Sequence, residues 1–305
     1  MDLQDALLRE QAVLFGQTES LIGIVTDPVS RNGNELKPAV ILLNPGIVHR
    51  VGPGRIYVKI ARELAAIGFV VLRFDFSGIG DSGVRHDNLP FEKSALLEAR
   101  DAMDFLQATR DIKHFIFLGG CSGALISLEI ACSDPRVIGA VLINFPIAGD
   151  EDGQPNSDLH IRRAAHYYRH YALFDLKSWR NLLTGKTSYR NLSRVLRFQA
   201  KRLFFSEKKM SPQMPQFQVS LRRLVDRGVC LIFLCSEVDP LLDDLRQAGG
   251  DQLRQLCTLG KAALEIVPRS DHTFSSLDDQ ERLLTSILDR ISAISSTEQK
   301  LMNCA

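Results

Sequence analysis

The segment at 119–124, Gly-Gly-Cys-Ser-Gly-Ala, holds the residues with the clearest capacity for chemistry. A strand-like apolar run leads into it, and a helix-like apolar run follows it directly. A nucleophile on such a strand-to-helix turn has a strained backbone, so small residues are needed two positions before it and two positions after it. Cys121 meets this condition, because Gly119 and Gly123 flank it at those positions. The spacing therefore predicts Cys121 as a nucleophile.

Ser122 is the alternative nucleophile, since Gly120 and Ala124 occupy the same relative positions around it. The register favours Cys121, because the strand FIFLG and one further residue end directly before it. A thiolate is a strong nucleophile and forms thioesters with acyl groups. A cysteine at this turn therefore indicates acyl transfer or thioester cleavage rather than amide proteolysis.

Strand-like and helix-like runs alternate along the chain and would position this turn. The strand-like runs lie at 20–28, 38–44, 69–76, 114–120, 137–145 and 229–236. The helix-like runs lie at 55–68, 91–109, 122–133 and 278–294. Such alternation is typical of βαβ units, and strands buried on both faces need not alternate in polarity. The sequence therefore predicts an α/β fold with a mostly parallel sheet and helices on both faces.

This alternation stops after Pro146. Residues 160–205 hold eleven Lys or Arg against one acidic residue, in a chain whose net charge is only +1. This asymmetry predicts a basic, helix-compatible module inserted into the α/β core. Pro212 and Pro215 predict a loop at the end of this module, because proline interrupts helices. The predicted organisation is a first core segment, a helical lid and a second core segment, at 1–146, 147–215 and 216–305.

Four basic residues in the insertion share one helical face. They are Arg190, Arg194, Arg197 and Lys201, at positions i, i+4, i+7 and i+11. One interpretation is a solvated surface of the lid. The other is a docking face for an acidic partner, for which an acyl carrier protein fits best and anionic lipid or acidic glycan are rivals. A nucleic-acid partner is not predicted, because the stripe lacks a recognisable binding module.

The composition excludes several classes of protein. The 305 residues are 45% hydrophobic and 24% charged, which is ordinary for a globular protein and excludes collagen-like and disordered chains. The six cysteines form no Cys-x-x-Cys pair and no zinc pattern, so neither a metal nor a cofactor is expected. The apolar runs are too short to span a membrane, and the N-terminal sequence does not resemble a signal peptide. A cytoplasmic location is the prediction.

The stretch NPGIVHRVGPGRIYVKIARELAAIGFVVLRFDFSGIGDSG at 44–83, together with the turn at Cys121, resembles a known family. It is similar to the serine-aminopeptidase-like members of the α/β-hydrolase superfamily, including hydrolases encoded beside exosortase and biosynthetic gene clusters. The resemblance covers both core segments and fades across the insertion. It implies an α/β-hydrolase fold with an inserted helical lid. Most relatives carry serine at the turn, whereas this chain carries cysteine, as dienelactone-hydrolase-like members do.

The family's order of nucleophile, acid and histidine implies two further site residues. Asp239 follows the strand VCLIFLCS, where the family places its acid, and Glu237 is the nearby alternative. His272 lies on the loop after the strand AALEIV, where the family places its base. The histidine would remove the thiol proton, and the aspartate would orient the imidazole and stabilise its charged form. Together these residues form an expected Cys121–His272–Asp239 triad.

The resemblance also implies the donors that stabilise an oxyanion. They are the backbone amide of Ser122 and one amide from the loop after 38–44, for which Ile47 is expected. The predicted function is an acyl hydrolase or acyltransferase that acts on an ester or thioester through a covalent acyl-enzyme. The alternative is a catalytically inactive protein of the same fold that binds a hydrophobic ligand or an acidic partner.

Overall fold

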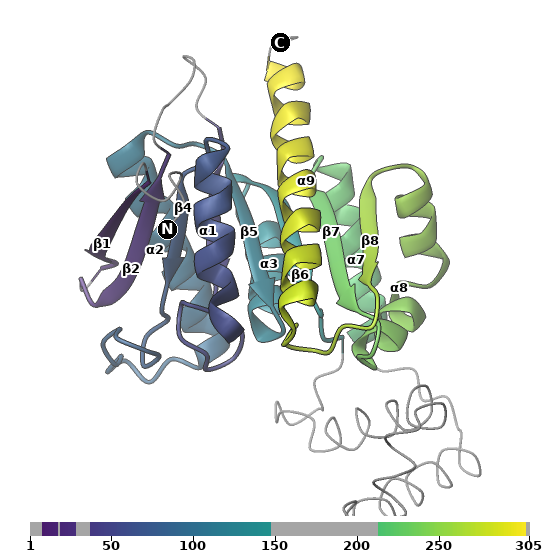
Figure 1. Cartoon of the computed structure of the whole chain (residues 1–305), viewed down its shortest axis with the longest axis horizontal. Coiled ribbons are helices and arrows are strands. Elements are labelled where there is room, and N and C mark those ends of the chain that lie inside the picture. The colour runs from purple at the N-terminus through teal and green to yellow at the C-terminus, as the bar shows by residue number, and fades with distance from the viewer. Residues whose placement is uncertain (1–7, 18, 29–36, 148–212, 303–305) are drawn as a thin grey trace, which may run out of the picture.

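One eight-stranded sheet forms the centre of the molecule, with the strand order β1-β2-β4-β3-β5-β6-β7-β8 (Figure 1). The computed structural model describes residues 8–17, 19–28, 37–147 and 213–302. The strands are β1 (Arg9–Phe15), β2 (Leu21–Asp27), β3 (Ala39–Leu43), β4 (Val71–Phe74), β5 (Phe115–Gly120), β6 (Val137–Ile143), β7 (Cys230–Ser236) and β8 (Ala262–Val267).

The six strands from β4 to β8 in the sheet order run parallel. Strand β2 pairs antiparallel with β4, and β1 pairs antiparallel with β2 as the last strand on that side of the sheet. The carboxyl ends of parallel strands meet at one edge of a sheet, and this is where sites form in such folds. Residues that follow β3, β5, β6, β7 and β8 are therefore brought to the same edge.

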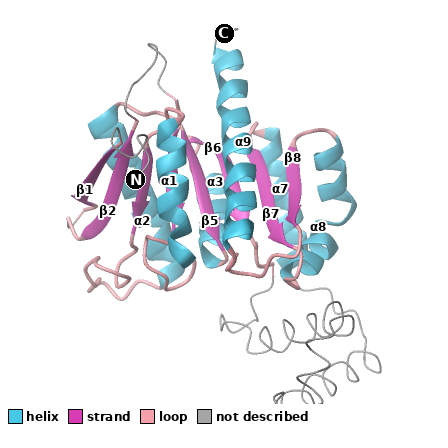
Figure 2. Cartoon of the chain, in the orientation of Figure 1, coloured by secondary structure: helices cyan, strands magenta, loops and turns pink. Residues whose placement is uncertain are grey.

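Helices cover both faces of the sheet (Figure 2). They are α1 (Ile56–Ala66), α2 (Phe91–Arg110), α3 (Ser122–Ser133), α7 (Gln213–Asp226), α8 (Leu241–Thr258) and α9 (Leu277–Met302), with a short 3-10 helix η2 (Pro53–Arg55) before α1. Helices α1 and α9 pack on one face, in front of the sheet in Figure 1, and α2, α3, α7 and α8 pack on the other. The predicted mostly parallel sheet with helices on both faces is confirmed.

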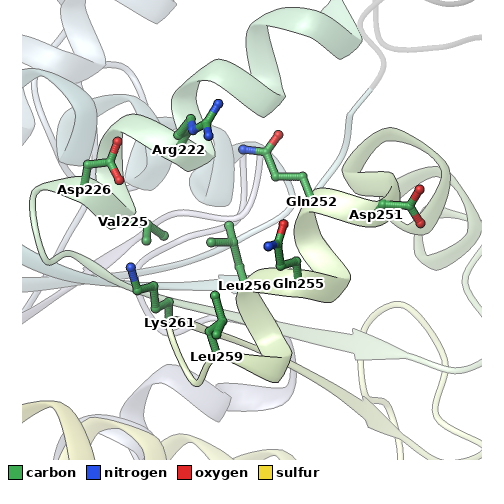
Figure 3. Close-up of a pocket in the computed structure, with 9 residues that line it drawn as sticks. All are labelled: Arg222, Val225, Asp226, Asp251, Gln252, Gln255, Leu256, Leu259 and Lys261. Carbon is green, nitrogen blue, oxygen red and sulfur yellow. The ribbon is translucent and has the colours of Figure 1, made fainter.

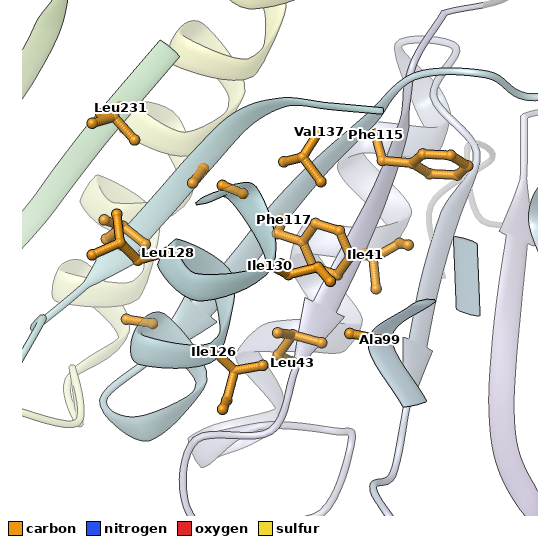
Figure 4. Close-up of a cluster of buried hydrophobic side chains, with 14 of the residues drawn as sticks. Ile41, Leu43, Ala99, Phe115, Phe117, Ile126, Leu128, Ile130, Val137 and Leu231 are labelled. Atoms are coloured by element: carbon orange, nitrogen blue, oxygen red, sulfur yellow. The ribbon is translucent and has the colours of Figure 1, made fainter. Parts of the chain in front are cut away.

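Successive side chains of the parallel strands enter two different hydrophobic cores, because side chains alternate along a strand. In β3, Val40 and Leu42 face α1 and α9, whereas Ile41 and Leu43 face α2 and α3. Figure 4 shows Phe117 of β5 in the second core, between β3 and α3. Burial of each such side chain contributes about 1.5–3 kcal/mol. Both layers of helices are thereby fixed to the strands that end at the functional edge.

The structure differs from the sequence predictions at two places, and a third prediction concerns residues that the structure does not describe. Strand β1 was not predicted, and it is an edge strand with mostly exposed residues. Pro215 lies in the first turn of α7 rather than in a loop, because first-turn amides have no partner within the helix and proline is tolerated there. Most of the predicted lid, 148–212, lies outside the described residues. Within the described part of the chain, no helix is long and apolar enough to cross a membrane.

Glu10 connects the edge strand β1 to the rest of the core. Its carboxylate accepts hydrogen bonds from Arg73 of β4 and Arg62 of α1, both at 3.0 Å. Burial raises the pKa of Glu10, but the two arginine hydrogen bonds outweigh this effect and lower the pKa below its usual value. Glu10 also neutralises Arg73, whose side chain is almost fully buried.

Replacing Glu10 with Gln should therefore lower the free energy of unfolding by about 1 kcal/mol at pH 7, because Glu10 is partly exposed and solvent screens its interaction with the two arginines. A lowered carboxyl pKa stabilises the fold above the unfolded-state value of about 4.3 and loses this effect as pH falls through the folded-state value. Urea unfolding should thus show the two proteins converging at acidic pH. Glu63→Gln, at an exposed position of α1, is the control; an equal loss in both variants would contradict this assignment.

Candidate active site

Cys121 lies on the turn between β5 and α3, in a backbone conformation that residues other than glycine rarely adopt. Its φ is 52° and its ψ is −118°. Such conformations cost about 1–3 kcal/mol and persist only where the surroundings fix them. Here the Cys121 amide donates to the carbonyl of Ile143 at the end of β6, at 2.9 Å, and the Cys121 carbonyl accepts the amide of Ala124 at 3.0 Å. The thiol is half-buried at the amino end of α3.

The two glycines around Cys121 are required by close backbone contacts. A Cβ on Gly119 would lie 2.3 Å from the carbonyl oxygen of Gly123, and a Cβ on Gly123 would lie 2.7 Å from that of Asn44. A Cβ on Gly120 would meet nothing closer than 3.5 Å. The positions that must be small are thus those two before and two after Cys121, which is the register expected for this residue rather than for Ser122.

The side chain of Ser122 contacts the loop that follows β3. Its hydroxyl oxygen accepts the amide of Gly46 at 2.8 Å. The amide of Val48 donates to the carbonyl of Pro45 at 3.4 Å and closes the turn. The amide of Ile47 therefore lies between the amides of Gly46 and Val48, which donate to the Ser122 hydroxyl and the Pro45 carbonyl. Ser122 is the first residue of α3, so its own amide has no acceptor within the helix.

His272 and Asp239 are paired through their side chains. Nδ1 of His272 is hydrogen-bonded to Oδ2 of Asp239, whose side chain is fully buried. The other carboxylate oxygen accepts the amide of Leu241 at 3.1 Å, where α8 begins. Glu237, the alternative acid, is exposed and instead accepts the amide of Arg269 at 2.7 Å. Of the two acids, Asp239 is the one in contact with the imidazole.

The His272 loop is fixed from within by its neighbour Asp271. Its carboxylate accepts the amides of Thr273 at 2.9 Å and Ser275 at 3.2 Å. Burial raises the pKa of Asp271, but these hydrogen bonds and those from the two hydroxyl groups lower it below its usual value. The loop that carries the histidine is therefore a structured turn.

Two further residues near the turn were not predicted from the sequence. Tyr57 of α1 is fully buried; its hydroxyl donates to the carbonyl of Leu43 at 3.1 Å and accepts the amide of Gly120 at 3.0 Å. Burial raises the pKa of Tyr57 well above its usual value, so the phenol stays neutral and serves as donor and acceptor. Asn144, after β6, donates to the carbonyl of His272 at 2.8 Å. Tyr57 lies within the stretch 44–83 that resembles the family, but nothing in the sequence around either residue marks its hydrogen-bond partners.

A buried polar network holds the loop after β3. The side-chain nitrogen of Asn44 donates to the backbone carbonyl of Val48 at 2.8 Å and to the buried carboxylate of Asp75 at 3.0 Å. Asp75 also accepts the backbone amide of Arg50 at 2.6 Å and pairs with its guanidinium. These contacts make the loop conformation depend on Asp75 rather than on the turn alone.

His49, Asp75 and Asp81 are the one group of possible metal ligands found among the described residues, with ligand atoms within 4.8 Å of one another. The guanidinium of Arg50 already binds both carboxylates, at 2.7 Å for Asp81. The Arg50 guanidinium thus supplies the positive charge that balances these two carboxylates, and the three residues belong to the hydrogen-bond network that holds the loop after β3.

Other candidate positions lie elsewhere. The basic stripe Arg190, Arg194, Arg197 and Lys201 lies outside the described residues. A hollow of about 370 Å³ lies between α7 and α8 (Figure 3). It is lined by Arg222, Val225, Asp226, Asp251, Gln252, Gln255, Leu256, Leu259 and Lys261. None of these is a predicted site residue.

Comparison with known proteins agrees with this arrangement. Residues 40–285 match the alpha/beta hydrolase family. Esterase EstD of Thermotoga maritima is 29% identical over 130 residues, which are 41% of this chain. The match spans only 30% of that esterase.

Solved structures share the fold at low sequence identity. An esterase of Pyrococcus furiosus aligns with a TM-score of 0.58 and 15% identity, over 96% of this chain and 94% of that one. Proline iminopeptidase of Mycobacterium smegmatis aligns at 0.56 and 16%, over 95% and 100%. Dienelactone hydrolase of Anabaena variabilis aligns at 0.53 and 14%, over 93% and 96%. The predicted α/β-hydrolase fold is confirmed, and since the family match extends over most of the sequence, the chain belongs to the alpha/beta hydrolase family.

Proposed function

We propose that this protein cleaves or transfers acyl groups of esters or thioesters, with Cys121 as nucleophile, His272 as base and Asp239 as the acid that orients the base. The observation that carries the proposal is at the end of β6. Ile143 accepts the amide of Cys121 at 2.9 Å, and the next residue, Asn144, donates to the carbonyl of His272 at 2.8 Å. The nucleophile and the base are thus anchored to two consecutive residues.

The chemistry follows from these residue types. The His272 imidazole takes the thiol proton, and the thiolate is favoured at the amino end of α3 by the helix dipole. The thiolate attacks the acyl carbon and forms a tetrahedral oxyanion. This intermediate collapses, and the bond between the acyl carbon and the leaving oxygen or sulfur breaks. The imidazolium donates its proton to the leaving group, which departs as an alcohol or thiol. Water or another acceptor then attacks the thioester with His272 again as base. The carbon–sulfur bond breaks, the acyl product leaves, and the Cys121 thiolate takes back the proton from His272. The Asp239 carboxylate stabilises the imidazolium in both steps.

The amides of Ile47 and Ser122 are the proposed oxyanion donors. Donors of this kind act best when they are fixed before the charge develops. The hydrogen bond between the Ser122 hydroxyl and the Gly46 amide supports this role, because it ties the loop of one donor to the residue that supplies the other.

An ester or thioester with an apolar acyl group is the substrate we propose. Ile47 is 91% exposed, and Leu125, one helical turn after Cys121, is 41% exposed, so apolar side chains are exposed both on the loop after β3 and on α3. The names of the relatives include two esterases, which also favours ester cleavage. Transfer to an amine or thiol remains part of the proposal because the acyl-enzyme would be a thioester. Delivery by an acidic acyl carrier protein rests on the charge of 160–205 alone.

The thiol of Cys121 should react selectively near neutral pH. Burial raises the pKa of Cys132, Cys230 and Cys257, and burial with the Asp239 carboxylate raises that of Cys235 to about 12. These thiols become thiolates only above the ordinary value of about 8.5. At pH 6.5, iodoacetamide should therefore alkylate Cys121 at least roughly tenfold faster than those four, as measured by peptide mass spectrometry.

The same labelling separates an enzyme from an inactive binding protein. His272→Ala and Asp239→Asn should each slow alkylation of Cys121 at pH 6.5, because the thiolate loses its proton acceptor or that acceptor's charged partner. Labelling of Cys121 at the rate of an ordinary thiol, unaffected by both changes, would favour the inactive alternative.

Cys121→Ala should abolish hydrolysis of p-nitrophenyl butyrate, whereas Ser122→Ala should lower kcat on the order of tenfold. Alanine keeps the backbone amide of residue 122 but releases the Gly46 amide, at a cost near that of one hydrogen bond. Ser127→Ala is the matched control, because within the described part of the chain the Ser127 hydroxyl bonds inside α3, to the carbonyl of Gly123 at 2.8 Å. Turnover retained in Cys121→Ala and lost in Ser122→Ala would assign the nucleophile to Ser122.

A further inference from the structure

Asn144, the residue directly after β6, has an unusual conformation in a buried place. It is 2% exposed, and its φ is 46°. Asparagine tolerates this left-handed region better than most residues with a side chain, yet the conformation still has a cost. The Asn144 amide donates to the carbonyl of Leu234 in β7 at 2.9 Å, so the turn away from β6 begins while the sheet is still paired.

The carboxamide of Asn144 joins two separate segments. Its nitrogen donates to the backbone carbonyl of His272 at 2.8 Å. Its oxygen accepts the backbone amide of Ser236 at 2.7 Å and the Ser236 hydroxyl at 3.2 Å. Ser236 is the last residue of β7, three positions before Asp239. One side chain therefore contacts the strand end that leads to the acid and the loop that carries the base.

We infer that Asn144 is a positioning residue that holds the main chain of His272 at a fixed place relative to Asp239 and Cys121. The inference rests on the proposed function, since it assigns His272 the role of base. The hydrogen bond between Nδ1 of His272 and the Asp239 carboxylate restrains one ring nitrogen of the imidazole, and the hydrogen bond that Asn144 donates restrains the backbone of His272. Together the two contacts restrain the direction of the second ring nitrogen from two segments, the residue after β6 and the loop after β7.

The nitrogen and the oxygen of the carboxamide can be tested separately, because different substitutions remove their hydrogen bonds. Aspartate at this position could still accept both hydrogen bonds from Ser236, but it could not donate to the carbonyl of His272. Glycine would remove both halves while adopting the positive φ without strain. A purely structural role through Ser236 would thus survive Asn144→Asp, whereas positioning of His272 would not.

The test measures alkylation of Cys121 by iodoacetamide at pH 6.5 in the full chain. This readout reports the thiolate that His272 supports and needs no knowledge of the substrate. Asn144→Asp and Asn144→Gly should each slow alkylation on the order of tenfold, and the pH dependence should move toward that of an ordinary thiol. A new carboxylate near the imidazole would by itself favour the imidazolium, so slower alkylation in Asn144→Asp has to come from the lost donor.

Two controls separate positioning from stability. Ser236→Ala removes only the 3.2 Å hydroxyl contact and should stay within about twofold of the wild type. Ile112→Ala removes a buried side chain just before β5, at the amino ends of the parallel strands and away from the proposed site. It should lower stability without slowing alkylation. Urea unfolding identifies any variant that is not folded under the assay conditions.

The outcomes are distinguishable from failure of the proposed function. If wild-type Cys121 is not activated, or if His272→Ala does not slow its alkylation, the proposed function fails first. If the wild type is activated and Asn144→Asp reacts as fast as the wild type, the positioning role is overturned while the proposed function stands. Slower alkylation in Asn144→Gly alone would likewise overturn it, because the contact to Ser236 would then be the one that matters.

Discussion

The hydrogen bond between the Cys121 amide and the Ile143 carbonyl is the contact on which the site depends. It extends the pairing of β5 and β6 by one residue into the turn, so Cys121 is held by the sheet although its φ and ψ are no longer those of a strand. The residue directly after β6, Asn144, donates a side-chain hydrogen bond to the His272 loop. The backbone carbonyl of Ile143 and the side chain of Asn144, two consecutive residues at one strand end, thus hold the elements that carry the proposed nucleophile and base.

Close packing around this contact leaves little freedom for the turn. Helix α3 approaches the end of β3 so closely that Gly123 cannot carry a Cβ, and Gly119 is closed in by the backbone of Gly123. On the opposite face of the sheet, Tyr57 bridges the ends of β3 and β5. The loop after β3 is then held by the Ser122 hydroxyl on one side and the Asp75 carboxylate on the other. The strained conformation of Cys121 is therefore imposed by neighbours from three strands and two helices.

The features that could be predicted are those with a local pattern. Alternation of apolar strands and amphipathic helices predicts the parallel sheet, and the spacing of Gly119, Cys121 and Gly123 predicts the turn. The pairing of Asp239 with His272 was expected from the order of residues in the family, and the two side chains are in contact.

The features that escaped prediction depend on contacts between distant segments. Tyr57 and Asn144 act through hydrogen bonds to backbone groups 14 to 128 positions away, and no local pattern marks such a partner. Strand β1 is mostly exposed, so its pattern lacks the apolar run of a central strand. From the sequence, the Ser122 hydroxyl was considered only as an alternative nucleophile. In the structure it accepts the amide of Gly46, in a loop that lies 76 positions earlier in the chain.

The central claim is that an acyl group is transferred to the thiol of Cys121. The most direct measurement is rapid acid quenching of the protein during turnover of p-nitrophenyl butyrate, followed by peptide mass spectrometry. The account predicts one butyryl group on the peptide that contains Cys121, attached as a hydroxylamine-sensitive thioester and absent in Cys121→Ala. A butyryl group on Ser122, or turnover that persists in Cys121→Ala, would contradict it.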